Sequence, residues 1–160
     1  YEFDAAAAKV LLDLDALVLD TFREARHLAH GQTLTLDPFE PAQVEGDEDR
    51  LKQLLLILLD NALKYTPSSG SVTFGLHRQG SHVEILVRDT GIGIAPEDVH
   101  HVFERFYRAD PARSRDPGGT GLGLSIARWI AEQHEGTIWL ESQPGQGTTA
   151  LVRLPRCLCP

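Results

Sequence analysis

The sequence has no excess of basic residues. Its 160 residues hold 15 Lys and Arg against 23 Asp and Glu, a formal net charge of −8 at pH 7. An acidic surface argues against non-specific binding to nucleic acid or anionic lipid, because both need a basic footprint. Cysteine is also scarce, since only Cys157 and Cys159 occur. Two cysteines this close together exclude a secreted disulfide scaffold and are too few for a zinc site.

Long apolar runs are absent as well. The longest strictly apolar run, residues 54–59, is far shorter than the roughly 20 residues that a membrane-spanning helix needs. The first ten residues also lack the basic segment and apolar stretch of a secretory signal peptide. We therefore expect a cytoplasmic location.

The best-known phosphate-binding motifs are missing too. No G-x-x-x-x-G-K-[ST] segment occurs, which excludes a P-loop NTPase. The segment GTGLGL has Leu124 where the dinucleotide fingerprint requires its third glycine. The sequence shows no Ser–His–Asp or Cys–His arrangement for nucleophilic catalysis either.

What is present fits one folded domain. The hydrophobic content is 42% and the charged content 24%, as in ordinary globular proteins. Periodicity predicts a short helix from Pro96 and longer helices over 14–30, from the N-cap Asp47 to about Tyr65, and from about 122 to 136. It predicts strands at 33–37, 72–77, 82–89, 137–142 and 148–154. This order predicts an α+β fold, a two-layer α/β sandwich whose mixed β-sheet is covered on one face by about three helices. We expect a single domain over 1–160, with its core at about 14–154 and a tail at 155–160.

Glycine is concentrated in the second half of the chain. Nine of the 14 glycines lie between Gly91 and Gly147. Glycine-rich loops can expose N–H groups to phosphate oxygens. The segment GGTGLGL also leads directly into a predicted helix, whose N-terminus favours anions. The aperiodic stretch 101–120 lies among these clusters, and a loop of that length is typical of a lid or a binding loop. For any single pair of glycines, a role in shaping a turn is the alternative.

Asp89 is the most specific candidate for a ligand-binding residue. It has the same strand parity as Ile85 and Val87, so we expect its carboxylate to face the layer between the sheet and the helices. A buried carboxylate needs donors, and as an acceptor it suits the exocyclic amine of adenine. Gly91 and Gly93 would leave space for a flat ligand. The alternative is an Asp that caps its own turn through the N–H of Gly91.

A second set of candidates lies on the helix that ends before Pro67. At 3.6 residues per turn, a stripe spanning about 100° of arc contains Ile57, Asn61, Lys64 and Tyr65. The amide oxygen of Asn61 suits Mg²⁺, which binds nucleotide phosphates with few protein ligands. Lys64 offers a positive charge to phosphate and Tyr65 offers a ring. A buried polar residue bonded to backbone explains Asn61 equally well.

Five segments, in this order and spacing, resemble the motifs of one family: DNALKYTP, DTGIGI, FERFYR, GGTGLGLSI and GQGT. They are similar to the N box, first glycine box, F box, second glycine box and last glycine motif of the catalytic, ATP-binding domain of bacterial sensor histidine kinases, in the GHKL ATPase superfamily. The resemblance extends from about Leu14 to Leu154. It implies an α/β sandwich that holds ATP under a mobile lid.

The resemblance implies a role for each matching position. Asn61 matches the residue that coordinates Mg²⁺, and with Asp60 and Lys64 it forms the implied catalytic set. Asp89 matches the Asp that hydrogen-bonds the adenine amine, with Thr148 assisting through water. The implied nucleotide-binding set is Asn61, Lys64, Tyr65, Asp89, Gly91, Gly93, Ile94, Phe106, Arg108, Gly119, Thr120, Gly121, Leu122, Gly123, Leu124 and Thr148.

The sequence departs from the family pattern at one position. One turn before Asn61 the family usually has another Asn or a His, whereas this chain has Ile57. An aliphatic side chain cannot hold a metal-bound water or a phosphate, so we expect weaker metal affinity or turnover. In addition, none of the seven histidines has the sequence context of a phosphoacceptor. We expect all of them to be solvated or structural, with His134 on a surface.

The implied function is that of the ATP-binding catalytic domain of a two-component sensor histidine kinase. With ATP and Mg²⁺, such a domain transfers the γ-phosphoryl group to a histidine on a separate dimerisation domain, while lid arginines offset the developing charge (Arg105, Arg108, Arg113 and Arg115). The implied partners are that dimerisation domain and a downstream response regulator, with no nucleic acid. We expect this chain alone to be a monomer, and its parent to be either free in the cytoplasm or the cytoplasmic portion of a membrane-bound sensor.

Two other functions remain open. One is a nucleotide-binding interaction module that binds ATP but no longer transfers phosphate, a hypothesis that Ile57 supports. The other is a GHKL member of another kind, such as a gyrase-like ATPase or a serine kinase. The FERFYR segment and the short chain argue against the gyrase type. Hydrolysis of ATP by the chain alone would favour it.

Overall fold

A computed structural model of the chain describes residues 9–99, 101–104 and 123–157. The elements, in chain order, are β1 (Val10–Asp13), α1 (Leu14–Ala25), the 3₁₀ turn η1 (Arg26–Leu28), β2 (Thr33–Leu36), β3 (Gln43–Gly46), α2 (Glu48–Lys64), β4 (Ser71–Gln79), β5 (His82–Asp89), α3 (Pro96–Val99), α4 (Gly123–Gln133), β6 (Thr137–Gln143) and β7 (Gly147–Pro155).

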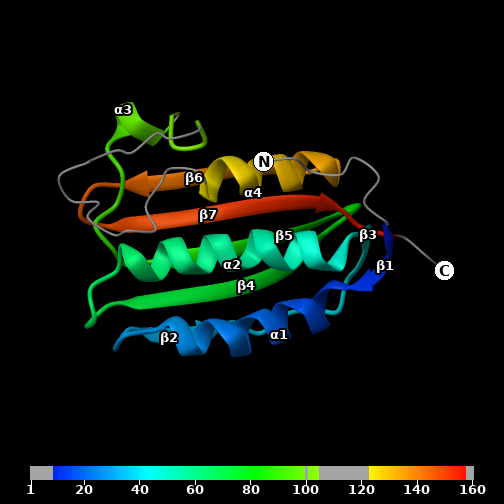
Figure 1. The fold of residues 1–160 in the computed structure, drawn as a ribbon, viewed down its shortest axis with the longest axis horizontal. Coiled ribbons are helices and arrows are strands. Elements are labelled where there is room, and N and C mark those ends of the chain that lie inside the picture. The colour runs from blue at the N-terminus through cyan, green and yellow to red at the C-terminus, as the bar shows by residue number, and fades with distance from the viewer. Residues whose placement is uncertain (1–8, 100, 105–122, 158–160) are drawn as a thin grey trace.

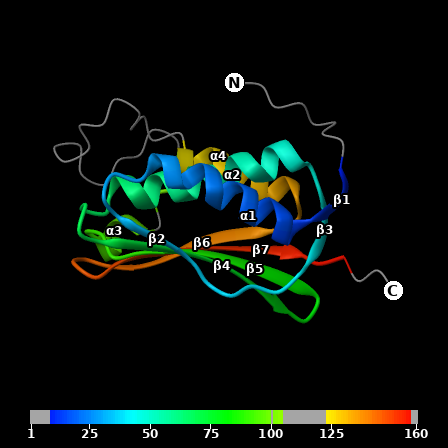
Figure 2. The same ribbon diagram turned by 90° about the horizontal axis from the view of Figure 1, so that it is seen from below.

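Five of the strands form one mixed sheet in the order β2-β4-β5-β7-β6. Strand β2 runs parallel to β4, and the other neighbours are antiparallel. Helices α1, α2 and α4 lie on one face of the sheet, as the edge-on view in Figure 2 shows. The alternating apolar residues of β5, Val83, Ile85 and Val87, are at most 1% exposed, because they face this helical layer. The predicted α+β sandwich with three covering helices is confirmed.

Helix α2 is the central helix of the layer and lies between α1 and α4 (Figure 1). Its N-cap is Asp47, as predicted, whose side chain accepts the N–H of Arg50 at 3.2 Å. Its buried residues occupy more than one face because the helix contacts the sheet and both neighbours: Leu51, Leu54, Leu55, Leu58, Leu59, Ala62 and Leu63. Despite this leucine content, no helix in the described ranges has both the length and the apolar character that crossing a membrane requires.

Strands β1 and β3 form a separate antiparallel ribbon that the sequence analysis missed. The pairing runs from Val10 opposite Gly46 to Asp13 opposite Gln43. Four residues per strand show too little alternation to be recognised from periodicity. Helix α1 also ends earlier than predicted, at Ala25, and the 3₁₀ turn η1 follows it.

His134 is buried beyond the end of α4, so its expected place on a surface is wrong. It is 5% exposed. Its Nε2 accepts the N–H of Asp47 at 3.0 Å, and its Nδ1–H donates to the carbonyl of Ile130 at 2.8 Å. Burial lowers the pKa of His134 below its usual value, and the hydrogen bond with the Ile130 carbonyl raises it by less. The charges of Lys9 and Asp47 have still smaller effects, which lower and raise this pKa respectively. The neutral ring therefore joins the C-terminal end of α4 to the N-cap of α2.

Candidate functional site

Asp89, the last residue of β5, is a buried carboxylate at the centre of the candidate site. The residue is 8% exposed. Its Oδ1 accepts the N–H of Gly91 at 2.9 Å and the N–H of Thr148 at 3.1 Å. The other oxygen, Oδ2, receives no hydrogen bond from any described residue. The turn-capping alternative thus accounts for Oδ1 and leaves Oδ2 available to a ligand.

The electrostatics of Asp89 reflect this incomplete pairing. Burial raises the pKa of the Asp89 carboxyl above its usual value, and the N–H groups of Gly91 and Thr148 lower it by less. A buried acceptor with one unsatisfied oxygen is stabilised when a hydrogen-bond donor reaches that oxygen. The group is therefore suited to binding a ligand that presents an N–H.

The backbone around Asp89 packs so closely that two positions require glycine. A Cβ at Gly91 would collide with the carbonyl oxygen of Tyr65, and a Cβ at Gly147 would collide with the carbonyl oxygen of Asp89. Gly147 also has a φ of 94°, in the left-handed region. The N–H of Ile92 donates to the Tyr65 carbonyl at 3.2 Å. The segment after β5 therefore lies directly against the end of α2.

Ser142, which was not predicted from the sequence as a site residue, connects three parts of the site. Its Oγ accepts the N–H of Ile94 at 2.7 Å, lies 2.7 Å from the Thr148 hydroxyl, and donates to the carbonyl of Gly147 at 3.1 Å. These bonds hold the segment before α3 against the hairpin that joins β6 to β7. The sequence pattern could have indicated Ser142, because it lies on the same face of β6 as Leu140, which packs against the core. A polar residue on the buried side of a strand needs partners.

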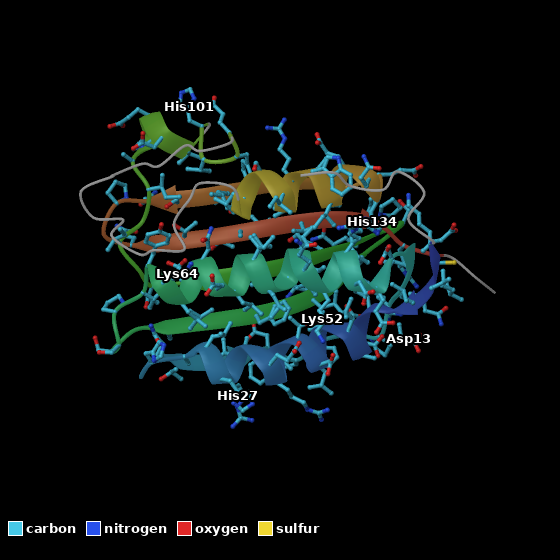
Figure 3. The ribbon with its side chains drawn as sticks, in the orientation of Figure 1. Asp13, His27, Lys52, Lys64, His101 and His134 are labelled. Carbon is cyan, nitrogen blue, oxygen red and sulfur yellow. The ribbon has the colours of Figure 1, made fainter. Side chains whose placement is uncertain are left out.

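The polar end of α2 carries the second group of candidates. Lys64 forms an ion pair with Asp60, one turn earlier, with 3.0 Å between Nζ and Oδ2, and Figure 3 shows Lys64 at the C-terminal end of the helix. The partly buried side chain of Asn61 makes no hydrogen bond to any described residue. The alternative that its amide is bonded to backbone therefore finds no support. Tyr65 caps the helix and is 39% exposed.

The side chains at the candidate site suit a divalent cation that arrives bound to a nucleotide. They suit a permanently bound metal ion less well. Within the described residues, no group of three or more His, Cys, Asp or Glu side chains could hold a metal ion. Mg²⁺ takes oxygen ligands and, at nucleotide sites, relies on substrate phosphates and water with one or two protein groups. The amide oxygen of Asn61, which has no partner in the described ranges, is a group of this kind.

Ile57 lies beside the start of α4. A Cβ placed on Gly123 would be 3.4 Å from the Cγ2 atom of Ile57. The next residue, Leu124, is partly buried against the core. The position where the family usually has a polar residue is therefore occupied by an aliphatic side chain next to the start of α4 in this chain.

The remaining predicted residues divide into three groups. The structure brings together, at the end of the sheet where β5 ends, the predicted residues Asp60, Asn61, Lys64, Tyr65, Asp89, Gly91, Gly93, Ile94 and Thr148. The predicted residues Gly123 and Leu124 lie at the start of α4, where Gly123 is beside Ile57 of α2. Outside the described residues lie Phe106, Arg108, Gly119, Thr120, Gly121 and Leu122, and also Arg105, Arg113 and Arg115.

A known family, several known proteins and several solved structures are similar to this chain. Residues 46–157 match the family model described as histidine kinase-, DNA gyrase B-, and HSP90-like ATPase. The sensor-like histidine kinase SenX3 of Mycobacterium bovis is 41% identical over 146 residues, which cover 90% of this chain and 36% of that protein. The sensor histidine kinase WalK of Bacillus subtilis is 42% identical over 142 residues, which cover 88% of this chain and 23% of that protein. The matched part of the chain thus spans 36% of the length of SenX3 and 23% of the length of WalK.

A solved structure is similar over almost the whole domain. The mycobacterial sensor histidine kinase MprB aligns with a TM-score of 0.82 and 31% identity, over 92% of this chain and 98% of that chain. The family predicted from the five motifs and the predicted fold class are both confirmed.

Proposed function

Because the chain belongs to the family of histidine kinase-, DNA gyrase B- and HSP90-like ATPases, we propose that it transfers the γ-phosphoryl group of Mg²⁺-bound ATP to a histidine on a separate domain. The chain is an ATP-binding catalytic domain of the sensor histidine kinase type. The Mg²⁺ ion, the dimerising acceptor domain, the downstream response regulator and a position on the cytoplasmic side of a sensor are parts of this proposal.

The observation that carries the proposal is Oδ2 of the buried Asp89, which has no partner among the residues that the structure describes. The exocyclic amine of adenine would supply the missing donor in a charge-assisted hydrogen bond. Guanine presents a carbonyl oxygen at the corresponding edge, and that oxygen would face the carboxylate. The site should therefore select ATP over GTP.

The end of α2 would bind the phosphate end of the nucleotide. Asn61, which has no side-chain hydrogen bond among the described residues, would offer its amide oxygen to Mg²⁺. Lys64, which is paired with Asp60, would offer a positive charge to phosphate. Bound Mg²⁺ would neutralise phosphate charge. Asp89 and Asn61 lie on different elements, β5 and α2, and the contact between Ile92 and Tyr65 joins those elements.

The transfer itself requires little covalent chemistry from this chain. The bond between the γ-phosphorus and the bridging oxygen breaks, a P–N bond to the acceptor imidazole forms, and ADP leaves. The proton on the other imidazole nitrogen passes to solvent or to a base of the acceptor domain. Catalysis of this kind depends on positioning and charge neutralisation, so the chain needs no nucleophile of its own.

Calorimetric titration of the chain with ATP, with and without Mg²⁺, tests the proposal, with GTP as the control. We expect ATP to bind more tightly than GTP and to bind more tightly with Mg²⁺. Addition of a cognate helical hairpin with its acceptor histidine should then give acid-labile phosphorylation of the hairpin. Absence of ATP binding would reject the proposal.

A second candidate function is a module that binds ATP without transferring phosphate. Ile57, beside the start of α4, favours it, because its aliphatic side chain cannot hold a metal-bound water. This function predicts ATP binding that does not respond to Mg²⁺ and a hairpin that stays unphosphorylated. The two readouts of the preceding experiment therefore separate the two functions.

A further inference from the structure

We propose that Gln32 is a positioning residue for the nucleotide site. Its side-chain amide fixes the last turn of α2. The inference rests on the proposed function, because that turn carries Asn61 and Lys64. None of the five motifs contains Gln32, which stands directly before β2. In Figure 1 the start of β2 and the end of α2 lie at the same end of the molecule.

The side-chain amide of Gln32 is fully engaged. Its Nε2 donates to the carbonyl of Leu63 and to the carbonyl of Thr66, each at 2.9 Å. Its Oε1 accepts the N–H of His30 at 2.6 Å. Both amide hydrogens and the amide oxygen therefore have partners, and the side chain is held at three points. Gln32 acts on the helix end and has no free group to offer a ligand.

The end of α2 needs such a partner. The last four carbonyls of a helix have no intrahelical donor, and α2 cannot continue because Thr66 precedes Pro67. The hydroxyl of Thr66 donates to the carbonyl of Ala62 at 2.7 Å. The bond from the Thr66 N–H to the carbonyl of Leu63 is long, at 3.4 Å. Gln32 therefore supplies the shorter bond to the Leu63 carbonyl. It also binds the carbonyl of Thr66, the second residue after the helix.

The two carbonyls that Gln32 binds lie on either side of Tyr65 along the chain. The Tyr65 carbonyl accepts the N–H of Ile92 at 3.2 Å, and it lies so close to Gly91 that no Cβ fits there. A displacement of this turn would therefore move the segment that follows Asp89. The same displacement would move the α2 residues proposed to bind Mg²⁺ and phosphate.

The backbone on both sides of Gln32 is fixed to the same region. Gly31 has a φ of 94°, and a Cβ there would be 3.1 Å from the Cβ of Ser68. The N–H of Thr33 donates to the carbonyl of Gly70 at 3.0 Å. The side chain therefore projects from a backbone that is itself anchored, which makes it a rigid support for the helix end.

Three variants test the inference through the affinity for ATP with and without Mg²⁺, measured calorimetrically at a temperature where all are folded. Gln32→Met keeps the length and removes the hydrogen bonds, and Gln32→Asn keeps the amide but is one methylene too short. Both should raise the Kd for Mg²⁺–ATP about tenfold, as expected for loss of one to two hydrogen bonds, and should reduce the gain in affinity that Mg²⁺ provides. The control is Val83→Ala, a cavity in the core (Val83 is 0% exposed) six residues from Asp89 along β5, which should lower the melting temperature without changing that gain.

The outcomes distinguish the inference from the function on which it rests. If the unmodified chain binds Mg²⁺–ATP and both Gln32 variants bind it like Val83→Ala, Gln32 is merely structural and the inference is wrong, while the proposed function stands. If the unmodified chain binds no ATP, both are wrong. If only one Gln32 variant folds, the result for that variant decides.

Discussion

The backbone N–H of Thr148, at the start of β7, donates to Oδ1 of Asp89, at the end of β5, over 3.1 Å. The two strands are neighbours in the sheet, and their register ends with Arg88 opposite Thr149, beside this bond. The same oxygen accepts the N–H of Gly91. Two backbone donors from different segments thus fix the carboxylate through Oδ1, and within the described part of the chain no donor reaches Oδ2.

Asp89→Asn should weaken ATP binding without destabilising the nucleotide-free domain. The variant loses a charge-assisted bond worth roughly 1.5–3 kcal/mol, about 10- to 150-fold in affinity, but its Oδ1 can still accept from Gly91 and Thr148. Because burial raises the pKa of Asp89, the stability that this carboxyl contributes is fully present below pH 3.8 and is lost as the pH rises through the folded-state pKa. Removing the charge at pH 7 should therefore leave the melting temperature equal or higher.

Calorimetry with ATP and thermal unfolding at pH 7 measure the two effects of Asp89→Asn separately. Unchanged ATP affinity would remove Asp89 from the adenine site. A large fall in melting temperature would show instead that the ionised form is needed for the fold.

Asn61→Ala should remove most of the effect of Mg²⁺ on ATP affinity. The variant lacks the amide oxygen proposed as the protein ligand, so the Kd for Mg²⁺–ATP should rise about tenfold, while the Kd for metal-free ATP changes little. The control on the same helix is Lys52→Ala, which breaks exposed ion pairs with Asp20 and Glu24. Such pairs contribute little free energy. An unaltered Mg²⁺ response in Asn61→Ala would contradict the assignment.

Gly91→Ala should lower both stability and ATP affinity. Its Cβ would collide with the carbonyl of Tyr65, and overpacking against backbone costs about 1–3 kcal/mol. The displaced segment carries Asp89, so the Kd for ATP should rise as well. Gly80→Ala is the control, because no atom lies within 4 Å of an added Cβ there and only the strain of a φ of 61° remains. Urea unfolding and ATP titration of both variants check this, and equal behaviour of the two would refute the steric argument.

His134 should make the stability of the domain depend on pH in the mildly acidic range. Its folded-state pKa lies below the unfolded value of 6.5, so the unfolded chain binds more protons and stability falls as the pH drops below about 6.5. Protonation of Nε2 would break the bond from Asp47, which costs ~1 kcal/mol. Urea unfolding between pH 5 and 7.5 should show this slope, weakened in His134→Gln. The control is His27→Gln, at an exposed position, which should leave the slope of stability against pH unchanged. A slope unaffected by His134→Gln would contradict the prediction.

Local patterns were sufficient for much of the fold. The alternation around Ile85 predicted a strand with one buried face, and the capping residue Asp47 marked the first turn of α2, because both signals arise from residues adjacent in the sequence. The roles of individual site residues, Asn61 and Asp89 among them, stay predictions. What the structure adds for these two is that Asn61 and one oxygen of Asp89 have no partner among the described residues.

The sequence by itself determined the family and the order of the main elements, since spaced motifs and periodicity are properties of the chain. Only the tertiary structure decided the pairing of β1 with β3, the burial of His134 against Asp47, the place of Ser142 and the support that Gln32 gives to α2. Each of these depends on contacts between residues 31 to 87 positions apart or on the register of separate strands. No local pattern specifies such contacts, because burial and hydrogen-bond geometry arise only when the layers pack.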